Sequence, residues 1–232
     1  VEGEQGRVIP RDPLLLRLPD GWQRPEAPVA PSIEVRSLVR ATAAAAIEFD
    51  WVTETARHVG TVVHRELQRC AREGGTVPGS VAERVALQRR YAAELAELGV
   101  PYDRRSAAVE KALEAVRRTL EDERGRWLLD ASHASAQSEL ALTGVVDNGL
   151  VSIVIDRTFL DATGMRWIVD YKTSSHEGAG LDDFLDNERE RYRAQLERYA
   201  QLMQALGNEP IRLGLYFPLL SGWREWAPGT MG

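Results

Sequence analysis

The sequence contains one cysteine, Cys70, and it has no hydrophobic run long enough to span a bilayer. A single cysteine excludes an intrachain disulfide framework and suits a reducing compartment, so we expect a cytoplasmic protein. We expect Cys70 itself to be a packed thiol in a helix. The sequence also lacks a signal peptide and a Walker A phosphate-binding motif. Any ATP hydrolysis would therefore lie in another part of a larger protein.

Positive charge is in deficit, with 29 Lys and Arg against 35 Asp and Glu, which gives a net charge of −6. A protein that binds nucleic acid normally presents a basic face, so this balance argues mildly against one. A metal-dependent nuclease, however, gathers carboxylates at its centre, where the cation offsets them. The net charge therefore excludes neither class.

The chain is long enough for one large domain with a real core. It begins at Val1 without a methionine, so we interpret it as a piece of a longer protein. Prolines recur without a period between Pro10 and Pro31, which disfavours long helices and central strands. We expect residues 1–36 to be a linker or poorly ordered arm from the parent protein, and residues 37–232 to be the folded domain.

Hydrophobic periodicity predicts an α/β fold in which a mixed sheet is flanked by helices and a helical insertion precedes the sheet. Asn148-Gly149 is a strong hairpin-turn signal, and Pro101 ends a helix. The predicted helices are residues 37–46, 53–73, 80–98, 106–129 and 186–206. The predicted strands are residues 138–146, 150–160, 165–172 and 211–217, with a further short one at 223–226.

Two acidic residues and a lysine stand on the second and third of these strands. The turn at residues 161–164 places Asp156 opposite either Val169 or Asp170, and the sequence leaves both registers open. In the second register the two carboxylates face each other and call for a cation between them, for which Mg²⁺ is suited. Lys172 leaves the same face of its strand as Asp170. The alternative is an exposed ion pair on an edge strand, but the neighbouring apolar run 167–169 favours a buried strand.

These residues also carry a family resemblance. Asp156, followed further on by Ile-Val-Asp-Tyr-Lys-Thr at residues 168–173, resembles the signature of the PD-(D/E)XK nucleases. It resembles in particular the nuclease domains of the RecB and AddA helicase–nucleases. Three further matches come in the expected order: Gly60-x-x-x-His64, Glu139, and Gln195-x-x-x-Tyr199.

The resemblance implies a restriction-endonuclease-like fold for residues 37–232 and a Mg²⁺-dependent exonuclease, with Mn²⁺ as a possible substitute. It implies DNA as substrate, helicase domains in the same parent chain, a possible partner subunit, and a role in double-strand-break processing and recombination. The implied metal ligands are His64, Asp156, Asp170 and the carbonyl of Tyr171. The implied catalytic set is Lys172, Asp170 and Asp156, supported by Glu139, Gln195 and Tyr199.

Simpler interpretations of single residues stay open. His64 could be a satisfied core histidine, Tyr199 could belong to the core, and Glu139 could be an exposed strand residue. Arg157, which departs from the family pattern, could pair with Glu139 or face away. For the whole chain, the alternatives are a DNA-binding or scaffolding domain that keeps the nuclease fold without catalysis, and a restriction-type nuclease.

Overall fold

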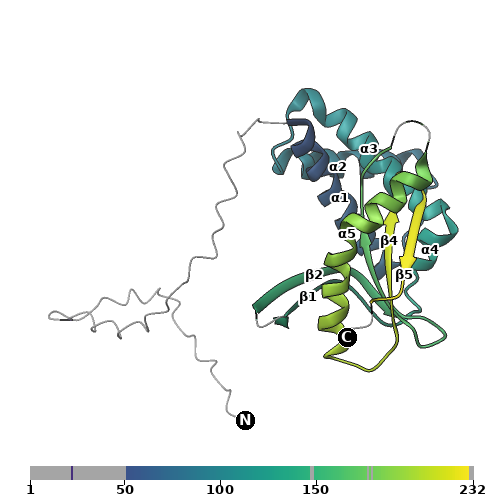
Figure 1. The fold of residues 1–232 in the computed structure, drawn as a ribbon. Helices are drawn as coiled ribbons and strands as arrows, with labels where there is room; N and C mark the ends of the chain where they lie inside the picture. The colour runs from purple at the N-terminus through teal and green to yellow at the C-terminus, as the bar shows by residue number, and fades with distance from the viewer. Residues whose placement is uncertain (1–21, 23–50, 147–148, 177, 179, 230–232) are drawn as a thin grey trace, which may run out of the picture. The chain divides into compact units, whose positions relative to one another are not determined.

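The computed structural model describes Trp22 and residues 51–146, 149–176, 178 and 180–229 (Figure 1). The predicted helix at residues 37–46 and the first residue of the Asn148-Gly149 turn lie outside the described residues. Within the described part of the chain, no helix is long and apolar enough to cross a membrane.

In the described part of the chain, four helices precede the sheet: α1 (Trp51–Glu73), α2 (Val81–Glu97), α3 (Tyr102–Glu121) and α4 (Glu123–Leu129). Helix α1 buries the predicted stripe of Val59, Val62, Val63 and Leu67, because these positions share one helix face. Gly74, at a φ of +76°, ends this helix in the left-handed conformation that glycine adopts without strain. The apolar stripe and the glycine stop therefore mark α1 as the sequence predicted.

The helix predicted at residues 106–129 is wrong as a single element, because it is interrupted at Asp122 and begins earlier. Asp122 is extended, and its side chain accepts a hydrogen bond from the amide of Gly125, which starts α4. The same carboxylate accepts a hydrogen bond from the Tyr216 hydroxyl at 3.0 Å. A contact to a distant strand therefore helps to fix the break, and local periodicity does not reveal it.

Among the residues that the structure describes, five strands form one mixed sheet in chain order: β1 (Ala134–Val146), β2 (Gly149–Leu160), β3 (Arg166–Tyr171), β4 (Ile211–Phe217) and β5 (Gly222–Trp226). The pairs are antiparallel except β3 with β4, which run parallel. Helix α5 (Leu181–Gln204) makes the crossover between these two parallel strands. It starts five residues before the predicted position, directly after Gly180 at a φ of +85°. The mixed α/β architecture that we predicted is confirmed.

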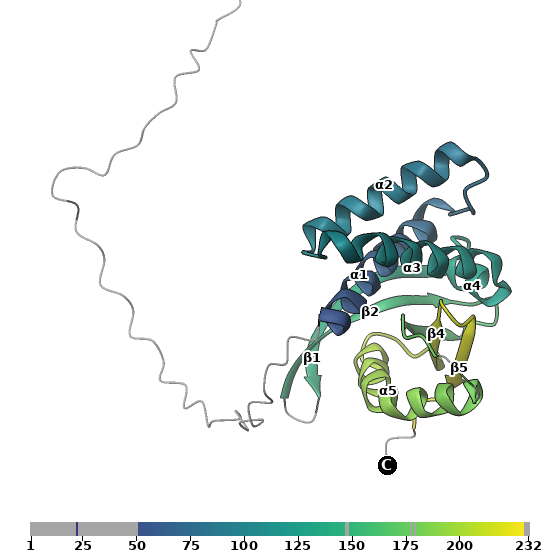
Figure 2. The ribbon, with the colours of Figure 1, turned by 90° about the horizontal axis from the view of Figure 1, so that it is seen from above.

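Helices cover both faces of the sheet, as the view from above shows (Figure 2). Helices α1 to α4 pack on one face around a core that includes Val169 and Tyr171 of β3. Helix α5 packs on the other face around a core that includes Ile168 of the same strand. Alternate residues of β3 therefore face different helices, as the two-residue period of a strand requires. Cys70 is buried in the first core, as predicted.

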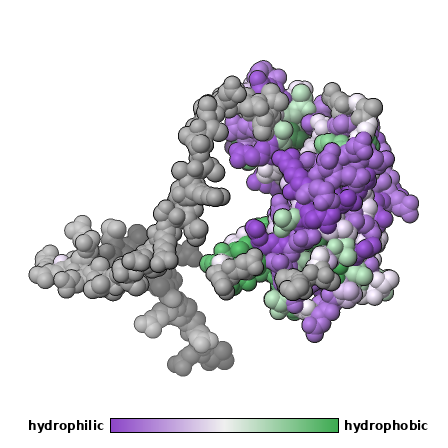
Figure 3. Space-filling model, in the orientation of Figure 1, coloured by the Kyte–Doolittle hydropathy of each residue, from purple (hydrophilic) through white to green (hydrophobic). Residues whose placement is uncertain are grey.

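The β1–β2 hairpin extends past the rest of the sheet. Strand β2 pairs with β3 over residues 157–160, whereas its pairing with β1 continues from residue 157 to Gly149. At the far end of this two-stranded ribbon, Val145 and Leu150 are 69% and 78% exposed. Figure 3 shows hydrophobic side chains gathered at this end of the hairpin. Asp156 stands at the point where β2 parts from β3.

Candidate active site

The register of β2 and β3 is the one that brings the two aspartates together. Arg157 pairs with Val169, and continuing this register by one residue places Asp156 opposite Asp170. The regular pairing of β2 with β3 begins at Arg157. One residue earlier, Asp156 Oδ2 accepts a hydrogen bond from the backbone amide of Tyr171 at 2.7 Å. The carboxylate of Asp156 thus takes part in joining the two strands at the site.

Arg157 faces away from Glu139, which resolves the alternative left open by the sequence. Its guanidinium is buried and donates hydrogen bonds to the carbonyls of Leu128 and Asp130. Neighbouring residues on a strand point to opposite faces, so Arg157 ties α4 to the sheet while Asp156 remains at the site.

Helix α1 brings His64 to the end of β3. Its Nε2 lies 3.0 Å from the carbonyl oxygen of Tyr171. A carbonyl can only accept a hydrogen bond, so Nε2 carries the proton and Nδ1 holds the lone pair when the ring is neutral. Nδ1 lies 3.5 Å from Asp156 Oδ1. The nitrogen that can bind a metal therefore faces the carboxylate.

The position of α1 depends on Gly60, one turn before His64. A Cβ added at Gly60 would lie 3.0 Å from Oγ1 of Thr173, which is tighter than an ordinary carbon–oxygen contact. The absence of a side chain lets the helix approach the chain directly after Lys172. This contact gives a physical reason for the Gly-x-x-x-His spacing.

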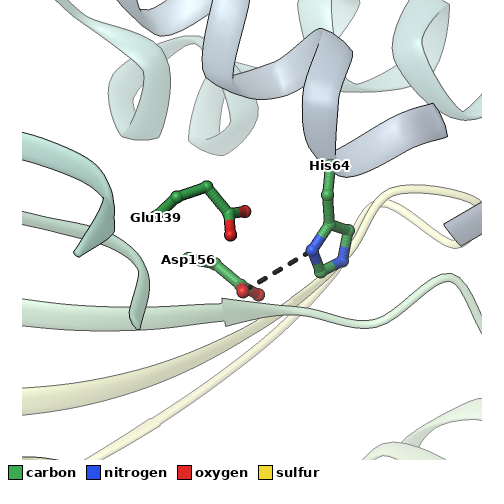
Figure 4. A group of neighbouring side chains, drawn as sticks. All are labelled: His64, Glu139 and Asp156. Carbon is green, nitrogen blue, oxygen red and sulfur yellow. Dashed lines mark ion pairs between the residues drawn. The ribbon is translucent and has the colours of Figure 1, made fainter. Parts of the chain in front are cut away.

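Glu139 completes a group of possible metal ligands. One ligand atom each of His64, Glu139 and Asp156 lies within 4.8 Å of the other two, and the three side chains point toward one another (Figure 4). Glu139 adopts a φ of +52°, a left-handed conformation that costs an L-residue of this kind on the order of 1–2 kcal/mol. Backbone strain of this kind is found at functional sites, where the surrounding structure holds the residue in place.

Asp170 lies beside this group, on the side of the site that faces α5. Its side chain is 5% exposed, Oδ2 lies 2.6 Å from Nζ of Lys172, and Oδ1 accepts a hydrogen bond from Gln195 Nε2 at 3.3 Å. Gln195 also donates to the Tyr199 hydroxyl at 2.6 Å. The structure thus connects Lys172, Asp170, Gln195 and Tyr199 in one polar chain. Tyr199 is at the same time part of the α5-side core.

Electrostatics at the site reflect an excess of negative charge. Burial and the charge of Asp156 raise the pKa of Asp170 to about 6, although Lys172 and His64 act in the opposite direction. Burial and Asp156 likewise raise the pKa of Glu139. Burial by itself would lower the pKa of His64, but its contact with Asp156 and the charges of Asp170 and Glu139 outweigh burial and raise it. The raised pKa values of Asp170 and Glu139 fit a site that takes up a cation.

The predicted site residues therefore converge from α1, β1, β2, β3 and α5. Those that offer a ligand atom to one point are His64, Glu139 and Asp156, so Glu139 stands closer to the centre than its predicted supporting role. Asp170 contacts Lys172 and Gln195, and the Tyr171 carbonyl contacts His64.

The sequence analysis placed Tyr192 only in the apolar stripe of its helix, yet its ring lies against Lys172. Its spacing of three residues before Gln195 is the signal that could have shown this.

One of the comparisons with known proteins identifies a family. Residues 40–222 match the model of the PD-(D/E)XK nuclease superfamily. No curated protein matches the chain. Among solved structures, the chain is similar to the crystal structure of SSO0001 at 16% identity, over 78% of this chain and 76% of that chain, with a TM-score of 0.28. The family match extends over most of the chain and includes every residue of the site described above, and on this ground the chain belongs to the PD-(D/E)XK nuclease superfamily.

Proposed function

We propose that this chain is a Mg²⁺-dependent DNA nuclease domain that hydrolyses phosphodiester bonds within a helicase–nuclease of the RecB and AddA type. The observation that carries the proposal is the convergence of His64, Glu139 and Asp156 on one point, beside the Lys172–Asp170 pair. Membership of a nuclease superfamily supports the hydrolysis of phosphodiester bonds as the class of reaction. The helicase–nuclease assignment is supported by the Asp-Tyr-Lys-Thr, Gly-x-x-x-His and Gln-x-x-x-Tyr motifs of the sequence.

The donor set fits a hard divalent cation. Carboxylate oxygens are ligands that suit Mg²⁺ and Mn²⁺, and His64 adds one neutral nitrogen, Nδ1, which faces the Asp156 carboxylate. His64, Glu139, Asp156 and Asp170 would hold the ion, with the Tyr171 carbonyl as a further oxygen. A bound Mg²⁺ lowers the pKa of a coordinated water and neutralises charge on the scissile phosphate.

The protein's own groups prepare the rest of the site. Lys172 presents an ammonium that can donate hydrogen bonds to a phosphate oxygen or to the attacking water. Gln195 holds the Asp170 carboxylate from the α5 side, and Tyr199 in turn holds the Gln195 amide. Groups fixed in this way lose little freedom when the substrate binds, which favours the transition state.

The choice of lysine at position 172 is informative in this chain. Of its 29 basic residues, 27 are arginine, and the lysines are Lys111 and Lys172. Lysine offers a compact point charge with rotatable donors, whereas arginine offers a planar fork. A site built around a compact ammonium next to a carboxylate would not accept the larger guanidinium in the same place. We expect Lys172→Arg to lose cleavage as Lys172→Ala does.

The decisive experiment measures cleavage of linear and circular DNA by the domain with Mg²⁺, with Mn²⁺ and with a chelator. Metal-dependent cleavage that is abolished in Asp170→Ala and Lys172→Ala, while both variants keep the parental circular dichroism spectrum, would support the proposal. Asp103→Ala on the exposed start of α3 and Lys111→Ala are the matched controls. Cleavage by Asp170→Ala at the parental rate would refute the assignment. DNA binding without cleavage would favour the scaffolding alternative, and cleavage confined to linear DNA would favour an exonuclease.

A further inference from the structure

The ammonium of Lys172 contacts both Asp170 and Tyr192, and the nuclease motifs account for the first of these contacts. Nζ lies 2.6 Å from Asp170 Oδ2, and it also lies 3.9 Å from the centre of the Tyr192 ring. Tyr192 stands on α5, half-buried, and packs against the α5-side core. An ammonium within about 6 Å of an aromatic face is attracted by the negative face of the ring. The ring therefore holds the ammonium on one side and Asp170 holds it on another.

The two neighbours differ in what they require of the site. The Asp170 carboxylate has the charge that would also attract a metal ion, so a bound cation weakens its attraction for Lys172. The Tyr192 ring is neutral, so it attracts the ammonium without adding a fourth negative charge to Glu139, Asp156 and Asp170. It also leaves N–H groups of the ammonium free for a phosphate oxygen or a water molecule. A ring at this place can keep Lys172 in position when Asp170 is engaged elsewhere.

A second cation lies near the same ring and provides an internal comparison. The guanidinium of Arg191 is 5.3 Å from the ring centre, but its side chain is 68% exposed and pairs with Glu188 at 3.2 Å. Contacts between exposed charges are screened by water and contribute little. Lys172 is closer to the ring, and its side chain is 18% exposed. The ring interaction is therefore stronger with Lys172.

We propose that Tyr192 is a positioning residue for the nuclease reaction, because its ring holds the Lys172 ammonium at the catalytic site through a cation–π contact. The inference rests on the proposed function and adds a residue outside the Gln195 and Tyr199 motif. It requires the face of the ring, and it does not require the hydroxyl.

The activity test separates the ring from the bulk of the side chain. Tyr192→Phe keeps the ring and should retain cleavage within about twofold, whereas Tyr192→Leu should lower kcat about tenfold with little change in KM, as expected for a contact of roughly 1–2 kcal/mol. Phenylalanines with one, two and three fluorines at position 192 keep the shape but weaken the negative face, so kcat should fall stepwise. Arg191→Gln is the control and should cleave at the parental rate. Equal rates for the leucine and phenylalanine variants, or no trend with fluorination, would overturn the proposal.

A second measurement does not depend on nuclease activity. Because the chain has two lysines, a protein labelled with ¹³C at lysine Cε gives one signal from Lys172 and one from Lys111, which Lys111→Arg assigns. Shielding by the ring should move the Lys172 ε-proton signal upfield, and this shift should persist in Tyr192→Phe and vanish in Tyr192→Leu. The Lys111 signal should not move. A Lys172 signal that is the same in the leucine variant would overturn the contact. A ring-dependent signal in a domain that does not cleave DNA would instead identify a failure of the proposed nuclease function.

Discussion

Helices α1 and α5 reach the candidate site from opposite faces of the sheet and in different ways (Figure 2). Helix α1 comes close through its backbone at Gly60 and delivers His64 to the metal-ligand group. Helix α5 contains no glycine and reaches the site through the long side chains of Tyr192, Gln195 and Tyr199. The α1 side is thus set by close backbone packing, whereas the α5 side is set by contacts between side chains. We expect the loss of a candidate ligand on the α1 side to cost more activity than the loss of a supporting contact on the α5 side.

Of changes on the two helices, His64→Ala should have the largest effect, because it removes a candidate metal ligand from the α1 side. Loss of a mere hydrogen-bond partner of a ligand costs roughly 10–100-fold in metal affinity, and loss of the ligand itself should cost more. Calorimetric titration with Mn²⁺ and cleavage assays measure both consequences. His58→Ala is the matched control, since His58 lies on the same helix and faces Glu54 at 3.9 Å. An unchanged Mn²⁺ affinity in the His64 variant would remove α1 from the site.

Asp170, on the side that faces α5, provides a test by pH in the absence of metal. Burial and Asp156 raise its pKa to about 6, whereas an unfolded aspartate has a pKa of about 3.9. At a pH between these two pKa values, the Asp170 carboxyl keeps a proton in the folded protein and has lost it in the unfolded chain. The stabilising contribution of the protonated group is therefore complete below about pH 4 and lost as the pH rises through about 6.

The loss amounts to on the order of 3 kcal/mol in the free energy of unfolding. Asp170→Asn cannot ionise, so its stability relative to the parent should increase between pH 4.5 and pH 7.5. Urea denaturation in a chelator measures this difference. A difference that stays constant between the two pH values would show that Asp170 ionises normally in the fold.

Much of this arrangement could be predicted from the sequence, because it is encoded locally. The three strands of the meander follow from their alternating patterns and turns. The sequence left two registers of β2 on β3 open, and the structure has the second of them, with Arg157 opposite Val169. The residues that converge were identified by their motifs. Whether each acts as assigned remains a prediction. The direction of Arg157 could not be predicted, since it depends on the carbonyls of Leu128 and Asp130 in another element.

The close contact between Gly60 of α1 and Thr173 predicts a smaller loss of activity than the loss of His64. In a helix interior, Gly60→Ala should favour the helix by up to about 1 kcal/mol, but the new Cβ would press against Thr173 Oγ1 at 3.0 Å. We expect stability near the parental value and cleavage reduced by roughly tenfold, because a misplacement of about 1 Å at a catalytic site can cost up to 100-fold.

The double variant with Thr173→Ala removes the opposing oxygen and should restore part of the activity that Gly60→Ala loses. The single Thr173→Ala variant sets the reference for this cycle. Strictly additive losses would mean that Gly60 does not set the approach of α1 to the site.

The smallest expected effect concerns the backbone of Glu139, which belongs to the ligand group on the α1 side. At its φ of +52° an alanine is strained and a glycine is not, so Glu139→Gly should be more stable than Glu139→Ala by about 1 kcal/mol. Both variants lose the carboxylate, so both should lose Mn²⁺ affinity to the same extent. At Ala141, two residues further along β1, a change to glycine should instead destabilise the protein by roughly 0.5–1 kcal/mol. If glycine also destabilises position 139 relative to alanine, the strain at the site is absent, and Glu139 is an ordinary strand residue whose position the ladder alone determines.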